Sequence, residues 1–185
     1  MIITSKHRVK NAIRFWEQQQ NSCWMTLGQN FAWGTGGTSG SESSPPTEPL
    51  NTTTLNAPLC ANRATLYMVY SDNTNMAAPF AYLDTNNVVQ RFSSYASVAA
   101  ARAGSCLLVL ATSQITGAQL ISAGSNNFRE IGFSTDVVGT LGHTSDTFLP
   151  AANVADWGDL ESLQFRTVMT LEPESRYTGS TIFSF

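Results

Sequence analysis

The sequence carries little charge, since Asp, Glu, Lys and Arg make up 12% of its 185 residues, against about 25% in a typical globular protein. Aromatic residues reach 10%, and because disordered chains contain few aromatics, the low charge does not indicate disorder. A chain of this length buries roughly 70% of its unfolded surface on folding. The composition therefore predicts a single ordered domain over residues 1–185, with part of its surface covered by protein partners.

A basic excess is also lacking, because the net charge is −3. No field over the whole molecule would attract nucleic acid or a membrane surface. No apolar run is long enough to cross a bilayer, and the basic N-terminus is not followed by the apolar stretch of a secretory signal. We therefore expect neither nucleic acid nor membrane among the partners, and a protein made in a cytoplasm-like compartment.

The few charges are unevenly placed. Four of the ten basic residues lie near the N-terminus: Lys6, Arg8, Lys10 and Arg14. From residue 146 onward six acids face only Arg166 and Arg176. This distribution is typical of ordinary solvated faces, and it also permits attraction between the two ends or between neighbouring subunits.

Histidine and cysteine are scarce, with two and three residues. His7 and His143 cannot form a histidine-rich metal site. Cys23, Cys60 and Cys106 show no C-x-x-C or zinc spacing, and their odd number argues against a secreted disulfide framework. Cys106 lies in "SCLLVLAT", where a buried small hydrophobe is the expected role.

The remaining candidates for chemistry are weak. His143 and Asp146 in "HTSD" would suit a Ser-His-Asp triad, but no G-x-S-x-G motif supplies a nucleophile, so the stretch is predicted to be a turn. Asp156 and Asp159 flank Trp157 without the ligand spacing of a calcium loop, which predicts a polar turn. "GTGGTSGS" lacks the Lys of a phosphate-binding loop. We expect no enzymatic activity, no cofactor and no metal.

The stretch "FREIGFSTDVVG" combines charge with an apolar pattern typical of a strand. Neighbours in a strand point to opposite faces, so Arg129 and Glu130 diverge rather than act together. Apolar residues recur on one face: Ile131, Phe133 and Val137, with Thr135 between the last two. Arg129, Glu130 and Asp136 are therefore predicted to be structural residues.

One convincing helix is predicted at about residues 5–18. Thr4 or Ser5 can cap it, and apolar residues recur at helical spacing on one side: Val9, Ala12, Ile13 and Trp16. Basic residues in its first turn oppose the helix dipole, a cost that an acidic partner would offset.

A composition change marks residues 34–62, which are rich in Gly, Ser, Thr, Pro and Asn. This predicts an extended loop or arm that becomes ordered on contact with neighbouring subunits, or else a surface loop. The later runs are predicted to be strands. "RATLYMVYS" and "LQFRTVMTLEP" alternate, the second with Leu163, Phe165, Thr167, Met169 and Leu171 on one face, and "SCLLVLATSQI" is predicted to be a buried strand. "PFAYLD", "NVVQRFSSY", "NFREIGFSTDVV" and "STIFSF" are further strands, the last of them tied into a sheet. "SVAAARAG" is predicted to form one or two helical turns. The predicted fold is mainly β, an antiparallel sandwich or barrel-like body with one N-terminal helix.

Four aromatic residues raise a further hypothesis. Trp24, Phe31, Trp33 and Trp157 would form a stacking platform on a carbohydrate-binding β-sandwich. Aromatics also dominate protein cores and subunit interfaces, which is the alternative interpretation.

Three stretches resemble the baseplate wedge protein of T-even-like contractile-tailed bacteriophages, of the gene product eight type. The opening "IITSKHRVKNAIRFWEQQ…SCWMTLGQNFAWG" is similar to that family's N-terminal helix, apolar strand and aromatic turn, here Thr4 to Arg8, Leu27 to Gly28, and Trp33. "FREIGFSTDV" and "RTVMTLEP…STIFSF" resemble its later strands. The matches lie near the two ends, and the chain looks shortened.

The resemblance implies a non-enzymatic structural protein of the virion tail, assembled in the host bacterial cytoplasm. It implies contacts with other wedge or fibre-attachment subunits, several copies around the tail, and room for a homodimer. Because "REIG" strands recur in related tail proteins, a neck, collar or tail-fibre adaptor protein is the alternative within the virion.

Overall fold

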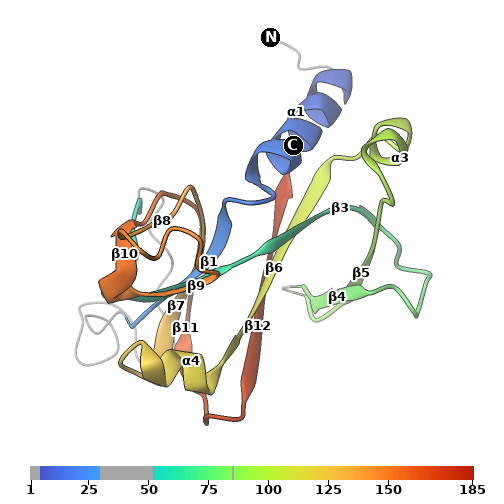
Figure 1. Cartoon of the computed structure of the whole chain (residues 1–185). Coiled ribbons are helices and arrows are strands. Elements are labelled where there is room, and N and C mark those ends of the chain that lie inside the picture. The colour runs from blue at the N-terminus through green and yellow to red at the C-terminus, as the bar shows by residue number, and fades with distance from the viewer. Residues whose placement is uncertain (1–4, 30–51, 85) are drawn as a thin grey trace. The chain divides into compact units, whose positions relative to one another are not determined.

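The computed structural model describes residues 5–29, 52–84 and 86–185 (Figure 1). Their fold is mainly antiparallel β with a long N-terminal helix, as the sequence predicts. The elements in chain order are α1 (Ser5–Gln19), β1 (Cys23–Gly28), β2 (Pro58–Arg63), β3 (Thr65–Ser71), β4 (Phe80–Leu83), β5 (Val89–Ser94), α3 (Val98–Ala103), β6 (Leu108–Thr116), α4 (Gly117–Ser122), β7 (Asn127–Thr135), β8 (Val138–Gly139), β9 (Phe148–Pro150), η1 (Ala151–Asn153), β10 (Val154–Asp156), β11 (Asp159–Thr170) and β12 (Arg176–Ser184).

The strands form two five-stranded sheets, with orders β11-β7-β1-β2-β9 and β12-β6-β3-β5-β4, and a small pair β10-β8. The chain divides into two compact units. The first comprises residues 1–20, 66–111 and 182–185, and the second comprises residues 21–65 and 112–181. The single domain inferred from composition stays a prediction. No helix within the described ranges is long and apolar enough to span a bilayer.

In the first unit, helix α1 docks through its apolar stripe, and its predicted bounds are confirmed to within a residue. Val9 and Ile13 are buried in a cluster with Met68, Ala101 and Cys106. The half-buried Trp16 packs against this cluster, and its indole Nε1 donates to the Leu66 carbonyl at 3.0 Å. The predicted helical turns near residue 98 form α3, whose N-terminus is capped by the Ser97 hydroxyl.

Strand β7 lies between β1 and β11 in the five-stranded sheet of the second unit. From Phe128 to Thr135 every residue is buried, so both faces of the strand are covered. Its register places Phe133 opposite Met25 and Glu130 opposite Gly28. Asp136 follows with a left-handed backbone, φ 59°, and Val137 then packs in a separate cluster with Trp24. The sequence predicted that one face of this strand would be apolar and buried, whereas the structure buries both faces.

The predicted loop of residues 34–62 is wrong at its C-terminal end. β2 begins at Pro58 and pairs with both β1 and β9, with Leu59 to Ala61 buried. Pro is tolerated as the first residue of a strand because no ladder donor is needed there. The six-residue strand was hidden by the polar composition before it. Residues 34–51 lie outside the described residues.

Strand β11 departs from the predicted alternation. The register to β7 shifts between Leu160 and Ser162 and again between Phe165 and Met169. Such bulges add residues without partners and rotate the side chains that follow. Thr167, predicted to share a face with its apolar neighbours, is exposed.

The C-terminal strand β12 pairs with β6, which confirms that the end of the chain is tied into a sheet. In the first unit, the Phe15 ring lies 4.9 Å from the Phe183 ring and 5.3 Å from the Phe185 ring. The Phe185 amide donates to the Leu107 carbonyl at 3.0 Å. Aromatic contacts therefore join α1 to the last residues of the chain.

We expect Phe185→Ala to lower the free energy of unfolding by about 1–3 kcal/mol, since a half-buried ring and one aromatic pair are lost. Urea unfolding followed by tryptophan fluorescence measures the change. Ser184→Ala is the matched control, because the Ser184 side chain is exposed. Equal stability of the two variants would contradict the role of this contact.

All three cysteines are buried free thiols, which confirms the structural role expected for Cys106. Burial raises the pKa of Cys60 to about 12. Burial and the nearby Glu161 carboxylate raise the pKa of Cys23 to about 12. Burial also raises the pKa of Cys106. Since the thiolate is the reactive species, these groups should be inert in the native protein.

We therefore expect the native protein to show no fast-reacting thiol with a disulfide reagent at about pH 8, where free cysteine reacts readily. The same protein in concentrated guanidinium chloride should show three reactive thiols, matching its three cysteines. A native thiol that reacts at the unfolded rate would overturn the buried placement.

The same pKa shifts predict instability in alkali. The thiols of Cys23 and Cys60 have pKa values of about 12 in the native state, against an ordinary 9.0, so the unfolded chain loses protons first. Their contribution to stability is complete below about pH 9 and is lost as the pH rises toward 12. A Cys23→Ala, Cys60→Ala double variant should therefore show a shallower fall in unfolding free energy across this range.

Candidate interaction surface

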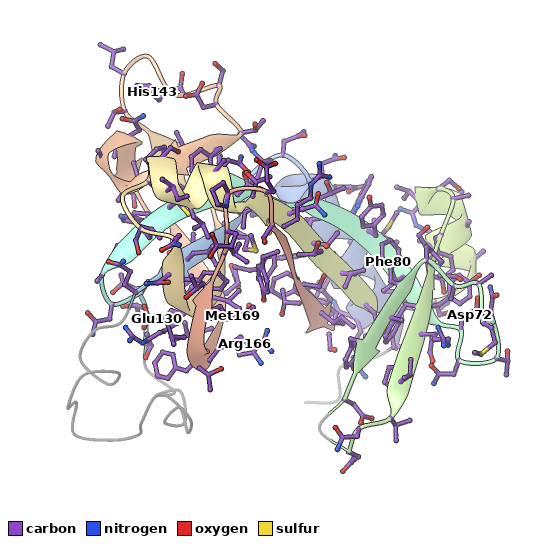
Figure 2. The ribbon with its side chains drawn as sticks, turned by 90° about the horizontal axis from the view of Figure 1, so that it is seen from below. Asp72, Phe80, Glu130, His143, Arg166 and Met169 are labelled. Carbon is purple, nitrogen blue, oxygen red and sulfur yellow. The ribbon has the colours of Figure 1, made fainter. Side chains whose placement is uncertain are left out.

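The two charged residues of β7, Arg129 and Glu130, are buried and hydrogen-bond to backbone groups. Glu130 is 1% exposed, and its Oε2 accepts the Asn56 amide at 2.8 Å (Figure 2). Arg129 is 8% exposed, and its guanidinium Nη1 donates to the Gln29 carbonyl at 3.3 Å. A Cβ at Gly28 would lie 2.4 Å from Glu130 Oε2, so glycine makes room for the carboxylate. The prediction that Arg129 and Glu130 are structural agrees with these backbone contacts.

Asp136 has a turn role. Its side chain is exposed, and its amide donates to the Ser22 carbonyl at 2.9 Å. The left-handed backbone is one that Asp and Asn tolerate better than other residues with a side chain.

His143 and Asp146 form a side-chain pair in the predicted turn. His143 Nδ1 lies 2.8 Å from Asp146 Oδ2, and the Asp146 amide donates to the His143 carbonyl at 3.2 Å. The predicted turn is confirmed, and the Asp146 carboxylate bonds the His143 imidazole. Within the described ranges no hydroxyl or thiol hydrogen-bonds the ring, so a triad is not assembled. Figure 2 shows His143 well apart from Glu130.

The "DWGD" stretch is the predicted polar turn. Asp156 Oδ1 accepts the Gly158 amide at 3.0 Å, and Gly158 has a φ of 63°. Trp157 packs against the buried cluster that contains Trp24 and Leu149. In the part of the chain that the structure describes, no three His, Cys, Asp or Glu side chains gather to hold a metal ion.

The described tryptophans do not make a stacking platform. Trp24 is 2% exposed, and the Arg63 guanidinium lies 4.1 Å from its ring centroid. Trp157 is half-buried on its cluster, and Trp16 is held by its hydrogen bond to the backbone. Phe31 and Trp33 lie outside the described residues. The core interpretation therefore holds for Trp24 and Trp157.

A groove of about 620 Å³ lies along α1 in the first unit. Three cations line it at four-residue intervals, Lys6, Lys10 and Arg14, and all three are exposed. Val9 and Ile13 contribute its apolar floor and are 7% and 3% exposed. The helix period explains the arrangement, because residues three and four apart fall on one side of a helix.

Helix α3 and the turn after it supply the rest of the groove. Figure 1 shows α3 beside α1, and the two share the cluster that buries Ala101. Arg102 and Ser105 line the groove from this side, and Glu17 is its single acidic residue. The surface, which we call the basic groove, thus carries four cations and one carboxylate around an apolar floor.

The positions of these cations lower the stability of helix α1. Like charges at i and i+4 destabilise a helix by about 0.2–0.5 kcal/mol per pair, and Lys6–Lys10 and Lys10–Arg14 are two such pairs. The first turn of α1 contains no acidic residue to complement the helix dipole. Within the described ranges, no carboxylate lies within the 4.0 Å ion-pair distance of these side chains.

The sequence identified only part of this surface. The basic character of α1 and its apolar stripe are visible in the spacing of residues 6–16. Arg102 and Ser105 were missed, because they come from a distant segment that the fold brings to α1. The one available signal was the predicted short helix at "SVAAARAG", which has a single cation.

Comparison with known proteins agrees with the resemblance to a phage baseplate wedge protein. A family model described as "Baseplate wedge 3 tail fiber network component" matches residues 1–185. No curated protein matches the chain. The match confirms the predicted resemblance to a phage baseplate wedge protein and extends it from the two ends to the middle of the sequence. The chain therefore belongs to the baseplate wedge 3 tail fiber network component family, a family of structural phage proteins.

Proposed function

We propose that this protein is a non-enzymatic subunit that joins other wedge or fibre-attachment subunits in the tail baseplate. The family match over residues 1–185 is the observation that carries the proposal. The match also supports the baseplate over the neck, collar or fibre-adaptor alternative.

Three features of the chain support a structural role. Charged residues are few, which suits a protein whose surface is largely covered in an assembly. The polar side chains singled out from the sequence bond to backbone or form turns. The basic groove presents cations without ionic partners among the described residues.

The proposal includes the arrangement of copies. Symmetric assemblies repeat each component around their axis, so the protein occurs in several copies around the tail, and copies are free to pair as homodimers. It is made and assembled in the host bacterial cytoplasm, where its free thiols stay reduced.

We expect quantitative mass spectrometry of purified virions to find the protein at a fixed multiple of the tail symmetry. Fractionation into heads and tails is the control, and the protein should follow the baseplate proteins. Imaging of a label fused to it should place the signal at the baseplate. Absence from virions, or a label at the neck, would remove the proposed function.

A further inference from the structure

We infer that the basic groove binds an acidic, amphipathic segment of a different baseplate subunit. This inference rests on the proposed function, because the occupant is a neighbour in the assembled tail. It goes further by naming the surface, the chemistry of the partner segment and the placement of its acids.

The first argument is charge complementarity. Lys6, Lys10 and Arg14 repel one another along α1, and Lys6 lies in the first turn, where the helix dipole disfavours a cation. A carboxylate beside each pair of cations would convert this repulsion into attraction. Because Arg102 adds a fourth cation from the opposite wall, the occupant lies between two positive sides rather than on an open surface.

The second argument is the apolar floor. Val9 and Ile13 line the groove beside the cations and are themselves members of the buried cluster of the first unit. An occupant that covers them needs an apolar side chain between its acids, as in helix-in-groove recognition. A groove of about 620 Å³ is within the range of about 300–1,000 Å³ of sites that enclose small ligands or a few side chains.

Geometry also sets where the acids of the occupant lie. Lys6 and Arg14 are eight residues apart, which is about 12 Å along a helix axis. The partner segment therefore places its acids within that length. Glu17 lines the groove beyond Arg14 and repels a further acid there, so the segment is not acidic at that end.

A protein segment fits better than a nucleic acid. The chain as a whole has a net charge of −3, which repels a long polyanion. A phosphate backbone would also leave the apolar floor uncovered, since it offers no apolar side chain.

Chemical labelling can test the groove directly, because Lys6 and Lys10 are the only lysines in the sequence. Acetylation with an amine-reactive ester, read by mass spectrometry, therefore reports on this surface. We expect at least fivefold less labelling of both lysines in intact virions than in the free protein. A zero-length carbodiimide should link Lys6 or Lys10 to a carboxylate of another baseplate protein.

A charge reversal supplies the second test. Lys10→Glu converts both repulsive pairs into attractive ones, so the melting temperature of the free protein should rise by about 1–3 °C. Incorporation of this variant into virions that lack the wild-type protein should fall at least tenfold. Arg8→Glu is the matched control, with the same change in charge on the same helix but outside the groove lining; it should be incorporated normally.

Several results would overturn the inference. They are equal labelling of the lysines in both states, normal incorporation of Lys10→Glu, links only to a second copy of this chain, or protection that disappears after nuclease treatment. Each of them leaves the protein in the baseplate, so the proposed function survives. Absence of the wild-type protein from virions would instead remove the proposed function itself.

Discussion

The burial of β7 on both faces is the constraint on which the second unit depends. A strand between two others uses its backbone donors and acceptors in the ladders, and its side chains must then pack or find partners inside. Apolar side chains such as Phe128 and Phe133 meet this condition directly. Glu130 meets it through the Asn56 amide, and Gly28 leaves space for the carboxylate. The adjacent charges Arg129 and Glu130, which resemble catalytic residues in the sequence, are thus explained by the packing of a strand inside the sheet.

The first unit depends on a different contact, the docking of α1 by its apolar stripe. Val9, Ile13 and Trp16 face the cluster, so the cations of the helix must face away from it. Since α3 packs on the same cluster through Ala101, its Arg102 is carried to the edge of the same groove. The basic groove is therefore a consequence of two helices burying their apolar sides together.

Sequence reasoning succeeded where one period governs a segment. The stripe of α1 and the alternation of the run that became β3 are regular enough to be read without tertiary information. It failed where pairing overrides local pattern. Pro58 to Arg63 form a strand because β1 and β9 flank it, and the bulges of β11 place Thr167 outside the expected face. The helix α4 at Gly117–Ser122 was also missed, although Thr116 and Gln119 form a capping box at its start.

The basic groove, too, could be predicted from the sequence only where local pattern decides its structure. One wall of the basic groove is encoded in a single helical period, whereas the other depends on Arg102 arriving from a separate segment. Charge repulsion along α1 weakens the free protein slightly, and no described carboxylate forms an ion pair with its cations. Stability alone would favour an acid at one of these positions, since a Glu four residues before a Lys or Arg supports a helix. A stripe of cations is therefore better explained by a requirement of the assembly than by the fold of the isolated chain.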